Sequence, residues 1–208
     1  MSSALIADDH PVVRAAVKIL LKQEGFKLIY EVSSGNEVLP MIREHKPDLV
    51  TLDLVMPCLD GLDVLARIQA SEERCRVLVF TSQEPMFYQD RCMRAGAAAY
   101  VSKTNDLKQL HAAVQAVKAG YSYFAKLPSS SVSLSTLQRS EKEMIDKLSD
   151  RELTIFLYLA QGMSNKGIAE IMNLSHKTVS TYKTRLIEKL NVESAVHLRD
   201  FAKRNHLI

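Results

Sequence analysis

Short apolar runs and amphipathic stretches alternate along the first 120 residues. The apolar runs have the length and composition of strands that are buried on both faces. They are Ala4–Ala7, Lys27–Val32, Leu49–Leu52, Val77–Phe80 and Ala98–Val101. The amphipathic stretches repeat apolar residues at helical spacing and lie near 11–24, 35–45, 61–70, 86–95 and 106–119. Five strands that are each followed by a helix predict an α/β domain with a five-stranded, doubly wound parallel sheet.

The pattern changes after residue 120. Pro128 is followed by a serine cluster that begins with Ser129–Ser131, which is typical of an exposed linker. We expect a short helix in the second half of this linker. From Ser149 onward the periodicity is helical and no strand signal occurs. The chain is therefore predicted to divide into an α/β domain at 1–121, a linker at 122–147 and an all-α domain at 148–208.

About four helices are expected in the C-terminal domain. Ser149 and Glu152 have the spacing of a capping box at the start of the first helix. The first helix is expected at 150–161, and the second begins at Ser164–Lys166. The third is capped by Ser175 or His176 and reaches Leu190. The fourth covers about 194–205. Asn173–Ser175 makes a tight turn between the second and the third, so these two helices are expected to form a helix-turn-helix.

The charge of the chain is unevenly distributed. Residues 1–120 carry 14 basic and 15 acidic side chains, whereas residues 149–208 carry 9 and 6. The last sixty residues therefore have a net charge of +3 before their histidines are considered. A small basic domain can bind a polyanion such as a nucleic acid, although this charge alone does not identify one.

The cysteines and the apolar segments bear on the cellular compartment. Cys58, Cys75 and Cys92 share no CxxC spacing, which suits a reducing cytosol better than a disulfide-rich secreted protein. The N-terminus lacks the pattern of a signal peptide. No run reaches the roughly eighteen apolar residues that a membrane span needs. We expect a cytoplasmic protein that does not contact a membrane.

Polar groups capable of chemistry follow the predicted strands. Asp8 and Asp9 come after the first strand, Asp53 after the third, Thr81 after the fourth and Lys103 after the fifth. The carboxyl ends of the strands in a doubly wound sheet meet at one edge, where ligands bind. Three carboxylates that lie together repel one another and call for a cation, and oxygen ligands favour a hard ion such as Mg²⁺. The lysine and the threonine would hold a small anion beside it.

Residues 4–119 carry these groups in the order found in receiver domains, and the chain resembles that family over this range. The resemblance implies a flavodoxin-like fold and a phosphoacceptor role for Asp53, which would take a phosphoryl group from a sensor histidine kinase. It also implies that Asp8, Asp9, Asp53 and the main-chain carbonyl of Val55 hold Mg²⁺.

The same resemblance assigns further roles. Thr81 would contact the phosphoryl oxygens, Lys103 would offset their charge, and Tyr100 would be an aromatic switch that turns inward. The loop after the phosphoacceptor matches the family at Met56-Pro57 and Gly61. Many receivers have a proline directly after the lysine, whereas this chain has Thr104, so the resemblance does not extend to that peptide bond.

Two classes of enzyme compete with this interpretation. Phosphatases of the haloacid dehalogenase type also form an aspartyl phosphate, but they need a second aspartate where this chain has Val55. A nucleotide-binding enzyme would need a phosphate-cradling loop, and neither G-x-G-x-x-G nor G-x-x-x-x-G-K-[ST] occurs in the sequence. We therefore do not expect an enzyme in the usual sense.

Polar and basic side chains dominate the outer side of the predicted helix-turn-helix. Helices of this kind place short polar and basic residues in the major groove, and basic residues nearby contact phosphates. The candidate DNA contacts are Lys166, Lys177, Thr178, Ser180, Thr181, Lys183, Thr184, Arg185 and Lys189. Residues 148–207 resemble the output domain of NarL/FixJ (LuxR-type) regulators, and in particular the BvgA/EvgA branch. In this family the final helix mediates dimerisation.

The two resemblances together imply a two-component response regulator. A sensor histidine kinase, which in the BvgA/EvgA branch is a hybrid kinase acting through a histidine phosphotransfer domain, would phosphorylate Asp53. The phosphorylated protein would bind double-stranded promoter DNA as a homodimer and control transcription. The alternative is a DNA-binding regulator that works without phosphorylation and uses a vestigial receiver only for dimerisation. The acidic set at Asp8, Asp9 and Asp53 argues against this alternative.

Overall fold

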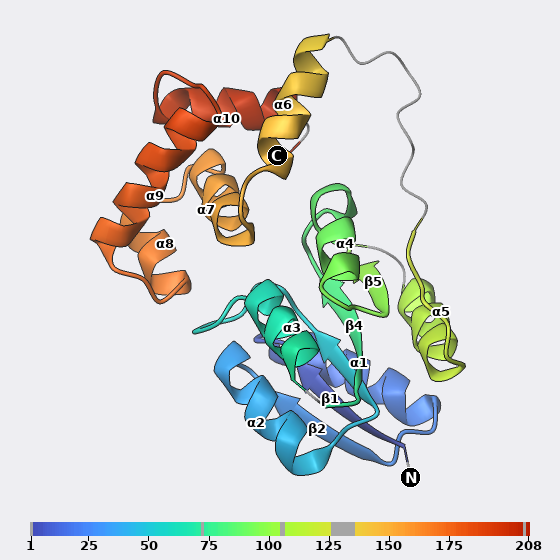
Figure 1. Cartoon of the computed structure of the whole chain (residues 1–208). Coiled ribbons are helices and arrows are strands. Elements are labelled where there is room, and N and C mark those ends of the chain that lie inside the picture. The colour runs from blue at the N-terminus through green and yellow to red at the C-terminus, as the bar shows by residue number, and fades with distance from the viewer. Residues whose placement is uncertain (1, 72, 105–106, 126–135, 206) are drawn as a thin grey trace. The chain divides into compact units, whose positions relative to one another are not determined.

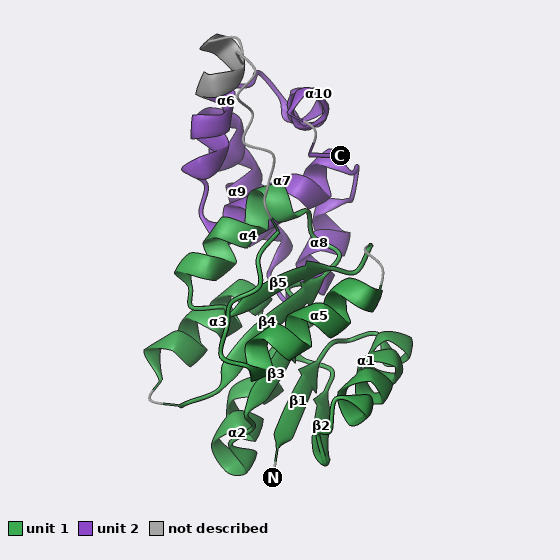
Figure 2. Ribbon diagram, turned by 90° about the vertical axis from the view of Figure 1, so that its right-hand side faces the viewer, with its two compact units in different colours: residues 1–127 green, residues 128–208 purple. Residues whose placement is uncertain are grey.

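The computed structural model describes residues 2–71, 73–104, 107–125, 136–205 and 207–208. The chain forms two compact units, residues 1–127 and 128–208 (Figure 2). The predicted boundaries at 121 and 148 stay a prediction. Residues 126–135 of the predicted linker lie outside the described residues. The helix α6, Thr136–Asp146, falls in the second half of that linker, where a short helix was expected.

A five-stranded parallel sheet forms the centre of the first unit, as predicted. Its strands are β1 Ser3–Ala7, β2 Leu28–Val32, β3 Leu49–Leu52, β4 Arg76–Thr81 and β5 Ala99–Ser102. They lie in the order β2-β1-β3-β4-β5, and all four pairings are parallel. The order reverses direction after β1, so the carboxyl ends of β1 and β3 form the switch point where such sheets bind ligands.

Helices cover both faces of this sheet. They are α1 Pro11–Gln23, α2 Gly35–His45, α3 Gly61–Ala70, α4 Pro85–Arg94 and α5 Leu107–Lys118. Helices α1 and α5 lie on one face, and α2, α3 and α4 lie on the other (Figures 1 and 2). A strand that is covered on both sides must be largely apolar, which explains why β1 and β3 are apolar apart from the buried Ser3 and Thr51.

Alternate strand residues build the core under α1 and α5. In β3, Leu49 packs into this core, while Val50 is fully buried under the other face. Thr51 lies on the same side as Leu49 and is 2% exposed. Its hydroxyl oxygen has no hydrogen-bond partner among the described residues. A buried hydroxyl without a partner lowers the stability of the fold because its hydration is lost without compensation.

The second unit is all-α among its described residues. After α6 come α7 Asp150–Ala160, α8 Asn165–Ile171, α9 His176–Lys189 and α10 Ala195–Arg204. These four helices confirm the predicted C-terminal domain, and Figure 1 shows them after α6. The predicted capping box is present, because the Ser149 hydroxyl accepts from the Glu152 N–H and the Glu152 carboxylate accepts from the Ser149 N–H. None of the described helices is both long and apolar enough to cross a membrane.

Glu152 also joins the first helix of this unit to the end of α9. Its two carboxylate oxygens lie 2.7 and 2.8 Å from Nζ of Lys189. Glu152 is 5% exposed. Burial alone would raise the pKa of Glu152, but hydrogen bonds from Lys189 and Ser149 outweigh it and bring the pKa below its ordinary value. The carboxylate therefore stabilises the packing of α9 on α7 in its charged form.

Replacing Thr51 with valine should stabilise the first unit. The Thr51→Val substitution keeps the shape of the side chain and removes the unpaired hydroxyl. We expect the free energy of unfolding to rise by about 1 kcal/mol in urea denaturation. The neighbouring Val50→Thr makes the opposite change at a fully buried position and should lower it. A decrease for Thr51→Val would contradict the interpretation.

Acid should weaken the second unit through Glu152. Because its pKa is lower in the folded than in the unfolded chain, its contribution is complete above about pH 4.3, the ordinary glutamate value. The contribution is lost as the pH falls through the lower folded value. Glu152→Gln should cost about 1 kcal/mol at neutral pH and flatten the acid dependence of stability, measured by thermal unfolding. The exposed Glu170→Gln on α8 is the control, and an equal pH profile for both variants would refute the role of Glu152.

Candidate functional site

The carboxyl ends of the strands bring the predicted polar groups together. Asp8 follows β1, Asp53 follows β3 and Thr81 ends β4. All three are buried, at 3%, 3% and 0% exposure. Buried carboxylates need partners because a charge without compensation is costly in a medium of low polarity. Lys103, which follows β5, supplies that partner.

Lys103 holds two of the carboxylates at once. Its Nζ lies 2.5 Å from Oδ2 of Asp53 and 2.7 Å from Oδ2 of Asp8. Burial would lower the pKa of Lys103, but the charges and hydrogen bonds of Asp53 and Asp8 outweigh this and raise it above the ordinary value. The amine therefore stays protonated and offers a fixed positive charge beside Asp53.

Asp9 and His10 complete the acidic cluster. Ligand atoms of Asp8, Asp9, His10 and Asp53 lie within 4.8 Å of one another. Oδ1 of Asp9 is buried and makes no hydrogen bond among the described residues, although Nδ1 of His10 lies 2.6 Å away. Such an orphaned carboxylate oxygen fits a cation site, and the three carboxylates are the hard oxygen donors that Mg²⁺ prefers. His10, whose main-chain N–H donates to Oδ1 of Asp8, was not predicted from the sequence.

The loop after Asp53 depends on two glycines. The Val55 N–H donates to Oδ1 of Asp53 at 3.2 Å, which turns the chain around the carboxylate. A Cβ on Gly61 would collide with the main chain of Asp53 and Leu54, so only glycine lets α3 begin here. A Cβ on Gly35, at the start of α2, would collide with the carbonyl of Leu59. The ends of two helices therefore fix the position of this loop.

The main chain of Gln83 connects Thr81 to Tyr100. The Gln83 N–H donates to Oγ1 of Thr81 at 3.4 Å, and the Tyr100 hydroxyl donates to the Gln83 carbonyl at 2.8 Å. Tyr100 is 2% exposed, so it already has the inward position that the resemblance implied for the switch. Burial raises the pKa of its hydroxyl above the ordinary value. Sequence reasoning missed Gln83 because its contribution is made by backbone atoms, which any residue has.

Thr104 stands where many receivers have a proline. The peptide bond between Lys103 and Thr104 is trans. The hydroxyl of Ser102 lies 2.7 Å from that of Thr104 and accepts from the Thr104 N–H at 3.3 Å. Hydroxyl side chains often stabilise turns through such local bonds. In this chain they take part in the turn that presents Lys103.

The helix-turn-helix has the predicted turn. Asn173 adopts a left-handed backbone conformation with φ 51°, which asparagine tolerates better than most residues. The Ser175 hydroxyl then accepts from the Thr178 N–H at 3.0 Å and caps α9. The inner face of α9 packs through Val179, Leu186 and, at its end, Leu190, all fully or almost fully buried. Its opposite side remains accessible.

Most of the candidate DNA contacts lie on that accessible side. The exposed ones are Lys166, Lys177, Ser180, Thr181, Thr184, Arg185 and Lys189, whereas Thr178 and Lys183 are half-buried. The hydroxyls of Thr181 and Thr184 donate to the carbonyls of Lys177 and Ser180. Lys189 differs from the rest because it already binds Glu152.

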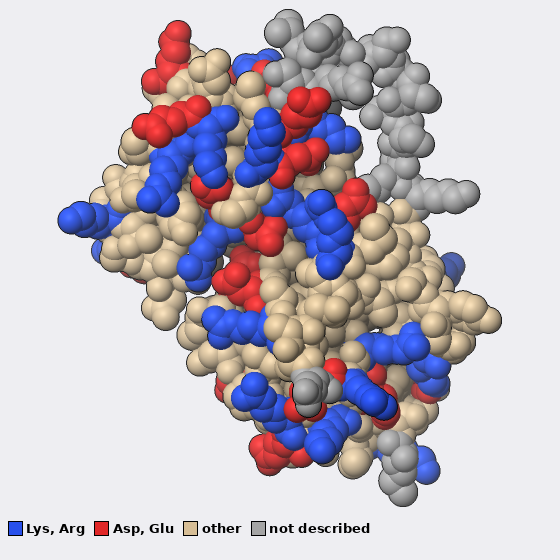
Figure 3. Space-filling view, in the orientation of Figure 1, with Lys and Arg blue, Asp and Glu red and all other residues tan. Residues whose placement is uncertain are grey.

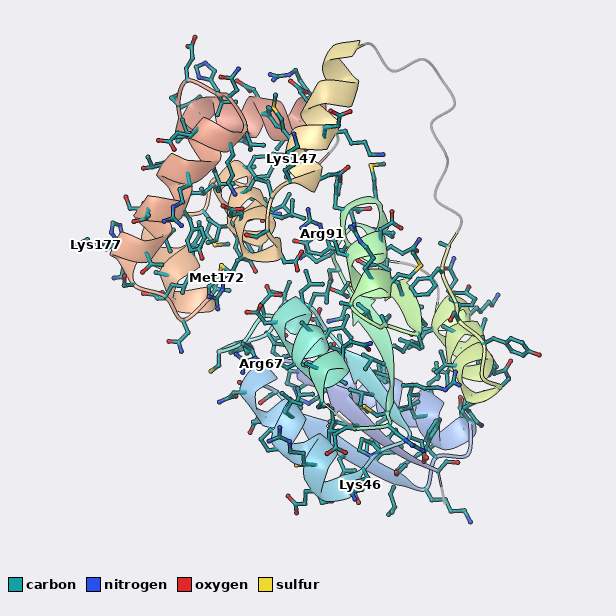
Figure 4. The ribbon with its side chains drawn as sticks, viewed as in Figure 1. Lys46, Arg67, Arg91, Lys147, Met172 and Lys177 are labelled. Carbon is teal, nitrogen blue, oxygen red and sulfur yellow. The ribbon has the colours of Figure 1, made fainter. Side chains whose placement is uncertain are left out.

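The charged side chains of this unit do not separate by sign. Figure 3 shows Lys and Arg interspersed with Asp and Glu over the visible face of the described residues from 141 onward, as expected for a net charge of only +3 in the last sixty residues. Figure 4 shows Lys177 at the start of α9. Basic residues at the start of a recognition helix can reach phosphates and base edges.

Comparison with protein families assigns both units. Residues 4–115 match the response regulator receiver domain, and residues 146–202 match the LuxR family of bacterial regulatory proteins. These matches coincide with the acidic site and with the helix-turn-helix. They confirm the resemblances on which the functional expectation was based.

Similar proteins have the same organisation. BvgA of Bordetella pertussis, named as a positive transcription regulator of virulence factors, is 49% identical over 206 residues, which cover 99% of each chain. EvgA of Escherichia coli K12, named as a DNA-binding transcriptional activator, is 35% identical over 99% of each chain. A solved structure of RcsB from Salmonella enterica serovar Typhimurium, bound to the rprA promoter with the phosphomimetic BeF3⁻, has a TM-score of 0.64 at 20% identity and covers 98% of each chain. The chain therefore belongs to the LuxR/NarL-type two-component response regulators, transcription factors in which a receiver precedes a DNA-binding domain and which are not conventional enzymes.

Proposed function

We propose that Asp53 accepts a phosphoryl group from a sensor histidine kinase and that this modification controls the binding of promoter DNA. The observation that carries the proposal is the buried contact of 2.5 Å between Asp53 and Lys103. A carboxylate that is 3% exposed and faces a fixed ammonium group is prepared for a reaction that places further negative charge beside it.

Each residue around Asp53 has a distinct task in this proposal. Oδ2 of Asp53 attacks phosphorus, and the bond from phosphorus to the kinase histidine breaks. Lys103 leaves its contacts with the carboxylates and binds an oxygen of the new phosphoryl group. Thr81 donates its hydroxyl to a second oxygen. The Val55 N–H, which donates to Oδ1 of Asp53, holds the carboxylate in its orientation.

The acidic cluster fits a bound Mg²⁺. Asp8, Asp9, Asp53 and the main-chain carbonyl of Val55 would hold the ion, whose charge would offset that of the phosphoryl oxygens. The orphaned Oδ1 of Asp9 supports this assignment. Without a cation, Lys103 is the positive partner of Asp8 and Asp53, so the site has a cationic partner in either state.

The output is proposed to be transcription control by a homodimer on double-stranded promoter DNA. The names of BvgA and EvgA describe transcription regulators, and the match over 99% of each chain supports the same role here. The likeness to this branch also favours a hybrid kinase that acts through a histidine phosphotransfer domain. Because the chromosome is the site of action, we place the protein in the cytoplasm.

The alternative is a vestigial receiver that only supports dimerisation. A receiver without phosphorylation has no need for three carboxylates and a lysine at a buried edge. Burying charged groups is costly even when they are paired, as Asp8 and Asp53 are with Lys103, so such a cluster gives a receiver without phosphorylation no advantage in stability over apolar side chains. The intact cluster therefore favours the phosphorylated switch.

Phosphorylation should depend on Asp53. Purified wild type should be labelled by a small phosphodonor with Mg²⁺, whereas Asp53→Asn should not, because the amide nitrogen and the remaining oxygen are poor nucleophiles. Asp90→Asn, at an exposed position of α4, is the matched control and should be labelled like wild type. Phos-tag electrophoresis measures the labelled fraction. Absence of label in wild type would favour the vestigial receiver.

Lys177 should contribute a phosphate contact. We expect Lys177→Ala to weaken binding to a duplex selected by the wild-type protein from a random pool. The slope of log affinity against log salt should become shallower by about 0.9, the value for one phosphate contact. Fluorescence anisotropy at several salt concentrations measures this slope. Lys22→Ala, an exposed lysine of α1, should leave it unchanged, and equal slopes for both variants would exclude the contact.

A further inference from the structure

A short segment after α5 extends the sheet beyond β5. The Tyr123 N–H donates to the Ala98 carbonyl at 2.9 Å, and the Tyr100 N–H donates to the Tyr123 carbonyl at 3.0 Å. Tyr123 thus makes a parallel bridge with Ala99, and its side chain packs partly buried against the core under α1 and α5. Tyr123, which falls at the beginning of the linker predicted at 122–147, is therefore hydrogen-bonded to the backbone of Tyr100.

A second attachment lies two residues further on. The side-chain amide of Gln89, in α4, binds the backbone of Ala125 at both ends. Nε2 donates to the Ala125 carbonyl at 2.9 Å, and Oε1 accepts from the Ala125 N–H at 3.1 Å. Gln89 is 5% exposed, whereas Ala125 is exposed. The side-chain amide thus donates to and accepts from the backbone of one residue, as the peptide groups of a neighbouring strand do.

The first of these attachments connects the phosphoacceptor pocket with the start of the linker, and the second holds the same segment on α4. Thr81 accepts from the backbone of Gln83, whose carbonyl accepts from the Tyr100 hydroxyl. The backbone of Tyr100 in turn binds Tyr123. When the Thr81 hydroxyl turns to a phosphoryl oxygen, its contact with the Gln83 N–H must change. The change can then pass through the hydrogen bond from Tyr100 to the Gln83 carbonyl and the one from Tyr100 to the Tyr123 carbonyl.

We infer that residues 123–125 are a detachable edge segment of the receiver, through which the state of Asp53 reaches the linker. Gln89 is the positioning residue that holds this segment on α4. This inference rests on the proposed phosphorylation of Asp53 and adds the route by which the signal leaves the receiver. A contact made to backbone atoms suits this task, because it fixes the path of the chain whatever side chains the segment carries.

The inference is tested in the full-length protein with two substitutions of Gln89. Gln89→Met keeps the length of the side chain and removes both hydrogen bonds, and the freed groups of exposed Ala125 can turn to water, so the fold should persist. Gln89→Glu keeps an acceptor for the Ala125 N–H and loses the donor to its carbonyl. Gln115→Met, at an exposed position of α5, is the matched control.

Hydrogen exchange of the peptide over residues 121–125 gives the first readout. In wild type, BeF3⁻ with Mg²⁺ should change the exchange rate at least threefold, whereas the control behaves like wild type. In Gln89→Met, exchange should be about tenfold faster without BeF3⁻ and should no longer respond to it, with Gln89→Glu in between. The same rate with and without BeF3⁻ in wild type would overturn the inference.

DNA binding gives the second readout, on a duplex selected from a random pool by phosphodonor-treated wild type. The gain in affinity on phosphorylation should fall to a third or less in Gln89→Met, although Phos-tag electrophoresis shows full labelling of Asp53. A labelled Gln89→Met protein with the full gain would overturn the inference and leave the proposed function intact. If the wild-type protein takes no label, both the inference and the proposed function are contradicted.

Discussion

The arrangement of the receiver depends on the buried contact of Lys103 with Asp8 and Asp53. Two carboxylates can be buried to 3% exposure here only because the Lys103 ammonium group lies close to both, at 2.7 and 2.5 Å. The parallel sheet brings the three groups together, since β1, β3 and β5 end at one edge and each contributes one of the groups. The glycines at 35 and 61 then allow the loop after Asp53 to lie close to the carboxylate without a collision.

Much of this arrangement could be predicted from the sequence. The five strands and the five helices of the first unit were placed within one or two residues, because strands buried on both faces and amphipathic helices leave strong apolar patterns. The charged groups were predictable too, since they follow the strands in a fixed order. The connections made by Gln83 and Gln89 were not predictable, because Gln83 takes part through its own backbone atoms and the side chain of Gln89 binds the backbone of Ala125. A pattern of side chains carries no record of which backbone groups will meet across the fold.

The DNA-binding unit illustrates the same limit in another way. Lys189 was expected to contact DNA, and that expectation stays a prediction. In the structure it binds the buried carboxylate of Glu152, whose part in the capping box was correctly expected. One carboxylate therefore caps α7 and anchors the end of α9. Sequence spacing reveals the first contact because it is local, whereas the second joins residues 37 positions apart.

The edge of the sheet at β5 has a consequence for how the receiver can be separated from the rest of the chain. Tyr123 covers backbone groups of Ala98 and Tyr100 that would otherwise form an open strand edge. Exposed edges invite pairing with a second molecule. A receiver cut directly after α5 would lack this cover and would be prone to pair with a second molecule through the β5 edge. A cut placed beyond Ala125 would keep both the bridge and the Gln89 contact, so the autonomous receiver is longer than its last helix indicates.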